Sequence, residues 1–339
     1  MRPLPVWKTV LVSAIFAALA ALLAWQRAAP EAQASVASAQ KVTVAFSRQP
    51  QSTLLQVALA KGYFAAEGLA VEPLILSYGK QALEALLEDR ADFAAVAETP
   101  IMFSVLRGNK PMVIAMIEAS SLNDGIVART TGGLASAADL KGRRVGFTPG
   151  TTSDFFLDSL LTANGLTRSQ VKAVPLQPDE MEDALVAGRV DAVSTWNYTL
   201  ARIAKRLGAE AIVFNDREIY TETYNIAVRQ RLLDSDPQAA ERFLRALIRA
   251  ETLVAQQPRE AQMIMAAATQ VDPELIREVW NAFSYNVVLD QTLLLALEDE
   301  ARWAMASGLS ANKTMPDFRA HIQRASLGAV KPDAVRITR

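Results

Sequence analysis

Short apolar runs alternate with helical patterns through the first two thirds of the chain. Residues 41–46 alternate between polar and β-branched or aromatic side chains, which predicts a strand, and residues 53–67 place apolar side chains at helical spacing until Gly68 ends the helix. The same reasoning predicts strands at 71–76, 93–96, 112–117 and 145–147, and helices at 79–89, 100–107 and 155–164. From residue 236 onward the pattern is helical almost throughout, at 237–256, 258–269, 273–281, 291–308 and 316–327.

One sequence pattern occurs twice in the alternating region. Residues 84–92 read Glu-Ala-Leu-Leu-Glu-Asp-Arg-Ala-Asp and residues 183–191 read Asp-Ala-Leu-Val-Ala-Gly-Arg-Val-Asp, an offset of 99 residues. Upstream of each copy, a glycine ends a helix and an apolar strand follows, so the repeated unit is helix, glycine turn, strand, helix and strand. A crossover helix connects neighbouring parallel strands, and each such sheet needs its own hydrophobic core. Two copies that lie so far apart in sequence therefore predict two similar lobes.

The predicted fold class is therefore α/β, with two lobes that each contain a mixed sheet flanked by helices. Lobe one is assigned to residues 41–128 and 226–339, so that the C-terminal helices pack on it, and lobe two to residues 129–225. The chain is expected to cross out of lobe one at 126–128.

Polar and aromatic residues follow the predicted strands. The repeated strands lead into Ala-Glu-Thr-Pro at 97–100 and Thr-Trp-Asn-Tyr at 195–198, and the strand at 145–147 leads into a Gly-Thr-Thr-Ser loop at 150–153 that opens a helix. Ligands of open α/β sheets bind beyond the carboxyl ends of strands, and the start of a helix presents N–H groups to an anion. The sequence thus predicts a ligand cleft between the lobes. The phosphate-loop pattern Gly-x-x-x-x-Gly-Lys-Ser/Thr is absent, which disfavours nucleotide hydrolysis.

The amino-acid composition excludes several classes of partner and of active site. The 339 residues are 51% hydrophobic, with 35 basic and 36 acidic residues and no basic run in the body of the chain, so nucleic acid is not expected as a partner. The lack of cysteine excludes disulfides, thiolate metal sites and a cysteine nucleophile. The single histidine, His321, is far along the chain from every strand end assigned to the cleft. Binding rather than catalysis is expected, without a cofactor or a metal.

The N-terminal residues predict export. Residues 10–25 carry no charge and follow Arg2 and Lys8, which is the order of a secretory signal. Residues 1–27 are assigned to a signal peptide or a membrane anchor, and residues 28–40 to a flexible linker with small-residue cleavage sites after Ala34 and Ala39. The apolar run is longer than a typical signal core and shorter than a typical spanning helix. Cleavage is favoured over a retained anchor, and a periplasmic location is expected in either case.

Four motifs together resemble a known family. Lys-Gly-Tyr-Phe-Ala-Ala-Glu-Gly-Leu-Ala-Val at 61–71, Asp-Leu-Lys-Gly-Arg-Arg-Val-Gly at 139–146, Gly-Thr-Thr-Ser at 150–153 and the Gly-x-Val-Asp-Ala turn at 188–192 resemble the periplasmic solute-binding proteins of the nitrate/sulfonate/taurine type. This group is related to thiamine-precursor-binding proteins, and the likeness covers about residues 41–300. It implies the two-lobe periplasmic binding protein fold (type II-like), a small-molecule ligand at the hinge, delivery to an ABC importer permease in the inner membrane, and a monomer.

The resemblance also implies a set of ligand-binding residues, all at predicted strand ends. They are Ser47, Arg48, Gln51, Glu98, Thr99, Asn123, Asp124, Thr151, Thr152, Ser153, Trp196 and Asn197. Trp196 is expected to cover the ligand with its apolar face, while the hydroxyls and helix N–H groups at 151–153 hold an oxyanion.

Glu98 distinguishes ligand classes at this predicted site. Many sulfonate binders that resemble the chain have small neutral residues there, and a carboxylate about 4 Å from an anionic ligand costs roughly 4 kcal/mol at an effective dielectric of about 20. Three arrangements remain open: Arg48 pairs with Glu98; Glu98 or Asp124 receives an ammonium while the 151–153 loop holds a sulfonate; or a neutral or cationic heterocycle stacks on Trp196. The second, a taurine-like zwitterion, is favoured over the others.

Two alternatives to a free sulfonate carrier stay open. A protein that keeps its N-terminal segment as an anchor would be a membrane-tethered ligand sensor, because closure of a cleft around a ligand serves a sensor as well as a carrier. A binder of a thiamine-precursor-like heterocycle is the other alternative.

Overall fold

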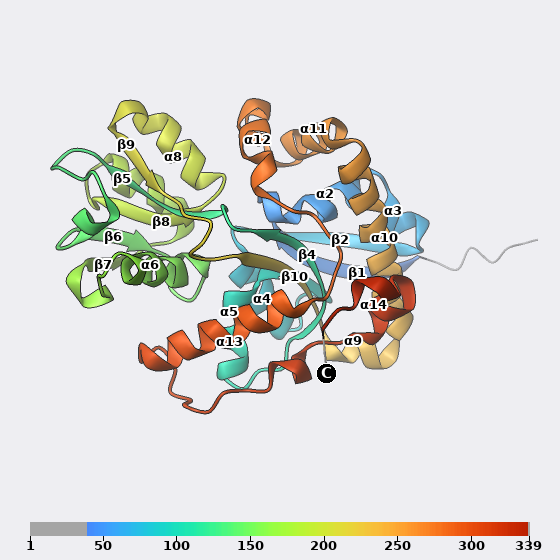
Figure 1. Cartoon of the computed structure of the whole chain (residues 1–339). Coiled ribbons are helices and arrows are strands. Elements are labelled where there is room, and N and C mark those ends of the chain that lie inside the picture. The colour runs from blue at the N-terminus through green and yellow to red at the C-terminus, as the bar shows by residue number, and fades with distance from the viewer. Residues whose placement is uncertain (1–38, 338–339) are drawn as a thin grey trace, which may run out of the picture. The chain divides into compact units, whose positions relative to one another are not determined.

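Residues 39–337 form two five-stranded mixed sheets flanked by helices in the computed structural model (Figure 1). The structure describes these residues alone, so the predicted signal peptide or anchor at 1–27 lies outside the described residues. Between residues 39 and 337, no helix combines the length and the apolar character that are needed to cross a membrane.

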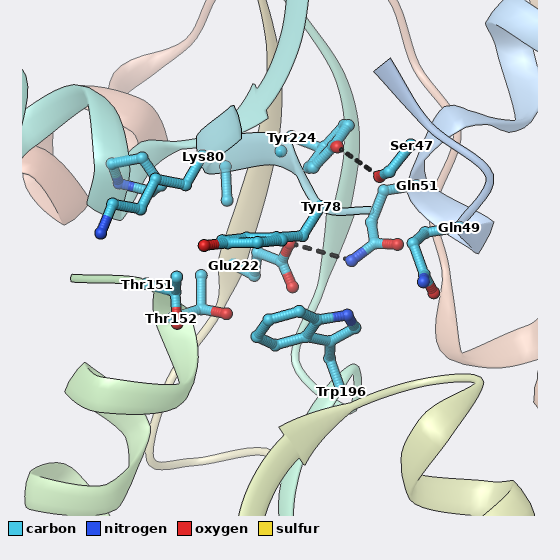
Figure 2. A pocket seen from close by; sticks show the side chains of 13 residues that line it. Ser47, Gln49, Gln51, Tyr78, Lys80, Thr151, Thr152, Trp196, Glu222 and Tyr224 are labelled. Carbon is cyan, nitrogen blue, oxygen red and sulfur yellow. Dashed lines mark hydrogen bonds between the residues drawn. The ribbon is translucent and has the colours of Figure 1, made fainter. Parts of the chain in front are cut away.

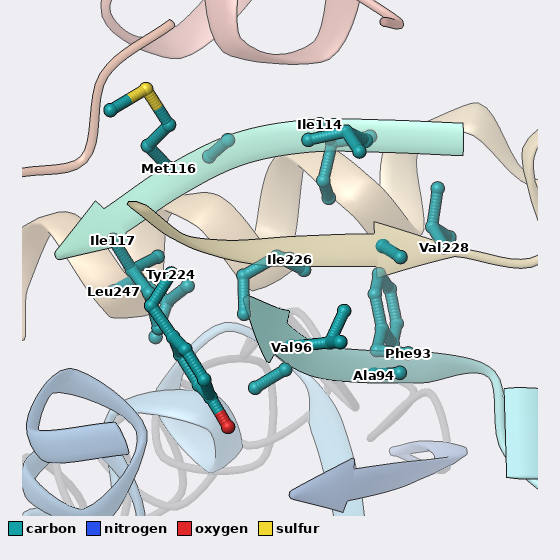
Figure 3. Packing of buried hydrophobic residues seen from close by; sticks show 14 of the residues in the cluster. Phe93, Ala94, Val96, Ile114, Met116, Ile117, Tyr224, Ile226, Val228 and Leu247 are labelled. Carbon is teal, nitrogen blue, oxygen red and sulfur yellow. The ribbon is translucent and has the colours of Figure 1, made fainter. Parts of the chain in front are cut away.

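The first sheet consists, in spatial order, of β2 (Leu69–Leu76), β1 (Gln40–Ser47), β3 (Phe93–Ala97), β10 (Glu222–Val228) and β4 (Met112–Ser120). β1 pairs in parallel with β2 and β3, whereas β10 runs antiparallel between β3 and β4. Buried apolar side chains cover both faces of β10 and its neighbours, among them Phe93, Ile114, Ile226 and Val228 (Figure 3).

The second sheet repeats this topology with β7 (Lys172–Pro175), β6 (Arg144–Phe147), β8 (Ala192–Trp196), β5 (Asp124–Arg129) and β9 (Ala211–Phe214). β6 is parallel to β7 and β8, and β5 runs antiparallel between β8 and β9. Separate apolar clusters pack on its two faces. The predicted fold class of two α/β lobes is confirmed.

The helices that cover the sheets are α2 (Thr53–Ala60), α3 (Tyr63–Ala66), α4 (Gly79–Leu87), α5 (Glu98–Leu106), α6 (Thr152–Ala163), α7 (Met181–Val186), α8 (Thr199–Leu207), α9 (Gln230–Ser235), α10 (Pro237–Gln256), α11 (Pro258–Thr269), α12 (Pro273–Val279), α13 (Gln291–Ala306) and α14 (Ala325–Val330). α10 packs against α2, α3 and α14, and α13 packs along α5, so these C-terminal helices contact the first lobe, whereas α12 also contacts α8 of the second lobe (Figure 1). The helix predicted at 316–327 is wrong: Ile322 pairs with Val113 of β4, and this bridge separates a single 3-10 turn at Phe318–His321 from α14.

The repeated sequence has the same structural role in both lobes. It joins α4 to β3 in the first lobe and α7 to β8 in the second. The backbone N–H of Thr43 donates to Asp92 Oδ2 at 2.9 Å, and the backbone N–H of Arg144 donates to Asp191 Oδ2 at 2.8 Å. Each aspartate therefore fixes the start of a repeated strand to the neighbouring strand, β1 or β6, which explains why both copies contain it.

Two segments connect the sheets. The chain leaves the first sheet after β4 and pairs in the second sheet from Asp124 onward, so the outward crossing lies at 121–123, earlier than the predicted 126–128. It returns through residues 215–221 into β10. β4 and β5 are both apolar and almost contiguous in sequence, so the hydrophobic pattern alone does not separate the strand of one sheet from that of the other.

Candidate functional site

A cavity lies where the strand ends of the two sheets face each other (Figure 2). It is lined by Ser47, Gln49, Gln51, Tyr78, Gly79, Lys80, Ala97, Pro100, Thr151, Thr152, Trp196, Glu222 and Tyr224, and its interior volume is about 30 Å³. This is room for about one or two water molecules, so an organic ligand enters only when side chains or the lobes move apart. A larger hollow of about 610 Å³ lies beside Arg259, Met263 and Arg277, but no aromatic side chain and no strand end lines it.

Three helices begin at this cavity. Tyr78, Ala97 and Thr151 immediately precede the first turns of α4, α5 and α6, and all three residues line the cavity. In none of the three helices does the side chain of that preceding residue cap the first turn. The first turn of a helix carries unpaired N–H groups and partial positive charge, so the three helix starts together favour an anionic group in the cavity.

Contacts between the lobes close the cavity. The rings of Tyr78 and Trp196 lie with their centroids 6.4 Å apart, tilted by 35° (Figure 2). Lys80 Nζ donates to the Pro149 carbonyl at 3.0 Å, and the Tyr78 hydroxyl donates to Gln177 Oε1 at 3.3 Å. Tyr78 and Lys80 come from the first lobe and their partners from the second, so the described conformation is one in which the lobes touch across the site.

Hydrogen-bond acceptors lie in the middle of the cavity, where Glu222 is, and on the side away from Lys80 and Thr151, where Gln49 and Gln51 are (Figure 2). Glu222 is 1% exposed, and its carboxyl group accepts from Gln51 Nε2 at 3.2 Å and from Asn123 Nδ2. The Oε1 atoms of Gln49 and Gln51 are buried and have no hydrogen-bond partner among the described residues. The cavity therefore has a donor side and an acceptor side, with two aromatic rings between them.

Five of the residues predicted to bind the ligand line this cavity: Ser47, Gln51, Thr151, Thr152 and Trp196. They come from β1, the turn after it, the start of α6 and the end of β8. The structure thus brings together residues that are up to 149 positions apart in sequence. Their role as ligand contacts stays a prediction.

Arg48 and Glu98 do not reach the cavity. The Arg48 side chain is exposed and forms no ion pair with Glu98, whose carboxylate is fully buried. Glu98 accepts hydrogen bonds from the Tyr220 hydroxyl, from the backbone N–H of Thr223 at 2.8 Å and from Thr223 Oγ1 at 3.0 Å. Burial raises the pKa of Glu98 to about 7, against the lowering effect of these hydrogen bonds. Neither the Arg48–Glu98 pair nor an ammonium group on Glu98 fits this geometry.

The other five predicted residues also lie outside the lining, because each uses its side chain within the protein. Thr99 Oγ1 donates to Glu300 Oε1, Ser153 Oγ to the Ser194 carbonyl, Asn197 Nδ2 to the Leu122 carbonyl and Asn123 Nδ2 to Glu222, while Asp124 Oδ1 accepts from Thr152 Oγ1. These bonds fix the loops that present the cavity residues.

Several lining residues were missed by the sequence reasoning. Tyr78, Gly79 and Lys80 follow β2, a strand that the pattern did predict, so the rule that ligands lie beyond strand ends could have included them. A Cβ atom on Gly79 would lie 2.9 Å from the Tyr224 hydroxyl, so the close approach requires glycine. Glu222 and Tyr224 were missed because they lie at the start of β10, an antiparallel strand of the first sheet that the chain enters on its return from the second lobe, and not at the carboxyl end of a strand.

Among residues 39–337, no group of three or more His, Asp or Glu side chains is arranged to hold a metal ion. His321 has its Nδ1 atom 3.3 Å from the Pro111 carbonyl and is not part of the cavity lining.

The chain is similar to binding proteins in sequence and in fold. A protein of Bacillus subtilis (strain 168), provisionally named an aliphatic sulfonates-binding protein, is 25% identical over 260 residues, which are 75% of this chain and 78% of the relative. The crystal structure of the periplasmic aliphatic sulphonate binding protein SsuA from Escherichia coli superimposes with a TM-score of 0.72 at 17% identity, over 84% of this chain and 92% of that chain. The alkanesulfonate-binding protein SsuA from Xanthomonas axonopodis pv. citri, bound to MOPS, gives 0.71 at 17% identity over 84% and 98%.

The same fold also occurs in an enzyme. The desulfurization enzyme DszB superimposes with a TM-score of 0.63 at 18% identity, over 87% of this chain and 99% of that chain. At these identities the solved structures show the fold alone, which is the periplasmic binding protein fold that the motifs predict.

The family assignment comes from the sequence itself. Residues 49–261, more than half of the chain, match the model of the family described as NMT1/THI5 like. The match contains the four motifs that predicted the resemblance, and the prediction is confirmed. The chain belongs to the NMT1/THI5 like family, and its fold is that of the periplasmic sulfonate-binding proteins.

Proposed function

We propose that the protein is an extracytoplasmic solute-binding protein that captures a small organic ligand with an oxyanion head, in the first place an aliphatic or taurine-like sulfonate. The observation that carries this proposal is the convergence of three helix starts on one closed interlobe cavity. Oxyanions bind at such helix starts because N–H groups and the positive end of the helix dipole point at them.

The cavity also contains a charged donor and two aromatic rings that would contact a sulfonate ligand. Lys80 offers an ammonium group beside the helix starts, with one of its N–H groups donated to the Pro149 carbonyl, whereas Thr151 and Thr152 donate their hydroxyl hydrogens to the Thr148 carbonyl and to Asp124. The Tyr78 and Trp196 rings provide apolar faces for a short carbon chain. Asp124, which accepts from the cavity hydroxyl of Thr152, lies outside the lining, and Glu222, which belongs to the lining, is engaged by Gln51 and Asn123. These features support binding rather than turnover.

Delivery to an ABC importer permease in the inner membrane and a periplasmic location are part of the same proposal. They rest on the names of the similar proteins, which include periplasmic sulfonate binders. The mass of the exported protein tests the location. Loss of the first 34 or 39 residues is expected for a free carrier, whereas an intact N-terminus in the membrane fraction would favour an anchored sensor.

A planar heterocycle is the second candidate ligand. The two rings that face each other across the cavity and the unpartnered amide oxygens of Gln49 and Gln51 favour a flat ligand with N–H groups at its edge. Membership of a family related to thiamine-precursor binders agrees with this alternative.

Isothermal titration calorimetry on the chain from residue 40 onward distinguishes the candidates. Heat with ethanesulfonate or taurine, and none with nitrate, is expected if the cavity takes a sulfonate with a carbon chain. Heat with an aminopyrimidine and silence with both sulfonates would replace the first candidate by the second.

A further inference from the structure

The loop that lines one wall of the cavity is held in place by charged side chains behind it. Thr151 and Thr152 of this loop line the cavity, and the backbone N–H of the preceding Gly150 donates to Asp154 Oδ2 at 2.9 Å. The other oxygen of Asp154, Oδ1, accepts from Arg168 Nη2 at 2.6 Å, and the same nitrogen donates to the Asp154 carbonyl at 2.9 Å. The position of the cavity loop therefore depends on Asp154, and that of Asp154 depends on Arg168.

The same guanidinium group also reaches the contact between the lobes. Arg168 Nε donates to Asp158 Oδ1 at 2.5 Å, and the other oxygen of Asp158 accepts from Trp303 Nε1 at 2.8 Å. Asp158 lies in α6 of the second lobe, whereas Trp303 lies in α13, which packs on the first lobe. A continuous chain of hydrogen bonds thus runs from α13 through Arg168 to the N–H of Gly150.

Arginine suits this position because its planar guanidinium group donates in several directions at once. Its Cζ atom lies 4.5 Å from the centroid of the Phe147 ring, which ends β6 directly before the cavity loop. The side chains of Asp154 and Asp158 are only 5% and 13% exposed, so without the arginine two poorly solvated carboxylates would lack their cation. A lysine would keep the charge but not the divergent donors.

The repeated unit of the fold forms without such an arginine in the first lobe. The matched segments read Glu-Gly-Leu-Ala-Val at 67–71 and Asn-Gly-Leu-Thr-Arg at 164–168. In the first lobe the chain enters β2 directly after the glycine, and Val71 packs on the apolar core. The second lobe instead has a 3-10 turn at Arg168–Gln170 before β7 begins. The requirements of the repeated fold therefore do not account for Arg168.

We propose that Arg168 is a positioning residue that couples the cavity loop at 150–153 to closure of the lobes. When the lobes touch, Trp303 completes the donors around Asp158, and Arg168 is free to hold Asp154 against the loop. When they separate, Asp158 loses that donor and competes with Asp154 for the arginine, so the loop is held less firmly. This inference deepens the proposed function, and only its consequence for the ligand rests on it: closure and binding at the loop favour each other, because such coupling is reciprocal.

Hydrogen exchange of the full chain without ligand tests the coupling. Trp303→Phe changes the first lobe and keeps an aromatic ring, yet it is expected to speed exchange of the backbone amides at 150–153 about 2–10-fold, the range that one hydrogen bond supplies. Arg168→Lys is expected to speed this exchange at least as much and also to increase the radius of gyration in small-angle X-ray scattering. A purely local role of Arg168 would leave the radius of gyration unchanged.

The double variant distinguishes this chain of hydrogen bonds from other effects of opening. Arg168→Lys combined with Trp303→Phe is expected to exchange no faster at 150–153 than Arg168→Lys alone, because both changes break the same chain. Independent, multiplying increases in the exchange rate would overturn the coupling. If Arg168→Lys does not fold, Asp158→Asn takes its place, since an amide keeps the shape of the side chain with only one acceptor oxygen.

Arg144→Lys is the matched control. Arg144 also pairs with an aspartate of the second lobe, with its Nη2 atom 2.7 Å from Asp191 Oδ1, and neither of the two residues lines the cavity. The control is expected to keep the wild-type exchange at 150–153 and the wild-type radius of gyration. Changes as large as those of Arg168→Lys would show that loss of any arginine pair in this lobe has the same effect, which would overturn the assignment to Arg168.

Calorimetry with ethanesulfonate separates this inference from the proposed function. If ethanesulfonate binds, Arg168→Lys and Trp303→Phe are expected to weaken its binding about 2–10-fold, and Arg144→Lys to leave it unchanged. Wild-type affinity in both variants, or wild-type exchange at 150–153 in Trp303→Phe, would overturn the coupling and leave the sulfonate proposal standing. Silence of the wild type with ethanesulfonate, taurine and an aminopyrimidine would count against the proposed function alone, because the exchange and scattering measurements involve no ligand.

Discussion

Glu118 is a residue whose chemistry is dominated by burial. It lies in β4 at 1% exposure with both carboxyl oxygens unpartnered, and burial together with the nearby Glu98 and Asp124 raises its pKa well above the usual range. A carboxyl group with a raised folded-state pKa favours the folded state below its unfolded-state pKa. That contribution is lost as pH rises through the raised value.

We therefore expect Glu118→Gln to change the pH dependence of stability. The wild-type free energy of unfolding should fall relative to that of the variant as pH rises from 5 to 8, by up to about 1.4 kcal/mol per pH unit, because only the wild type must keep a proton on residue 118 in the folded state. Urea unfolding at the two pH values measures this. Equal pH profiles for Glu118→Gln, the wild type and the exposed control Glu72→Gln would show that the pKa of Glu118 is not raised in the folded state.

A substitution at Trp196 tests most directly whether the cavity is the ligand site. It ends β8, is 6% exposed and lies against Tyr78. Trp196→Ala is expected to weaken binding of whichever probe gives heat by about 1–3 kcal/mol, because an aromatic wall supplies much of a small ligand's contact area. Trp280→Ala, outside the cavity, is the control. Unchanged affinity in Trp196→Ala would remove this side chain from the ligand contacts.

At the scale of elements, the two copies of the repeated unit differ at one turn. The residue that follows α7 by two positions, Gly188, has φ +70°, and the residue at the same place after α4 is Asp89 with φ +59°. Both turns lead into the aspartate that fixes the neighbouring strand. A left-handed backbone favours glycine because a Cβ atom is strained there.

Opposite effects on stability are thus expected at equivalent positions. Gly188→Ala should lower the free energy of unfolding by about 1 kcal/mol. Asp89→Gly should raise it by about a few tenths of a kcal/mol, and loss of the exposed Arg229–Asp89 ion pair reduces this gain. Thermal unfolding of both variants checks the pair. Stabilisation by Gly188→Ala would contradict the structural equivalence of the two turns.

At the scale of the whole described unit, a further contact joins the lobes outside the cavity lining. Trp303 of α13 donates from Nε1 to Asp158 Oδ2 of α6 at 2.8 Å, and its ring packs edge-on against Phe155 with centroids 5.2 Å apart. α13 belongs to the first lobe and α6 to the second, so a separation of the lobes breaks this contact. It therefore stabilises the closed arrangement relative to an open one.

Trp303→Phe keeps an aromatic ring but removes the hydrogen bond. We expect the unliganded protein to have a larger radius of gyration in small-angle X-ray scattering and to bind its ligand about 2–10-fold more weakly, which corresponds to the typical worth of one hydrogen bond. Trp280→Phe serves as the control. A smaller or unchanged radius of gyration in Trp303→Phe would mean that the contact does not hold the lobes together.

The sequence determined the architecture of this protein because periodicity and repetition are local properties. Alternating runs predicted β1, β2, β3 and β4, and the duplicated motif predicted a second lobe of the same kind, since each copy needs its own core. The family resemblance followed from four local motifs. Strand ends also indicated the region of the cavity, which is why Ser47, Gln51, Thr151, Thr152 and Trp196 were found.

Only the tertiary structure decided which side chains face the cavity. Glu98 and Asp124 stand at strand ends like their neighbours, yet they turn inward to Tyr220, Thr223 and Thr152. Glu222 instead reaches the site from an antiparallel strand that follows the whole second lobe in sequence. Whether a polar side chain is buried, paired or open to a ligand depends on groups that are 28 residues away for Asp124 and up to 125 residues away for Glu98, so no local pattern encodes it.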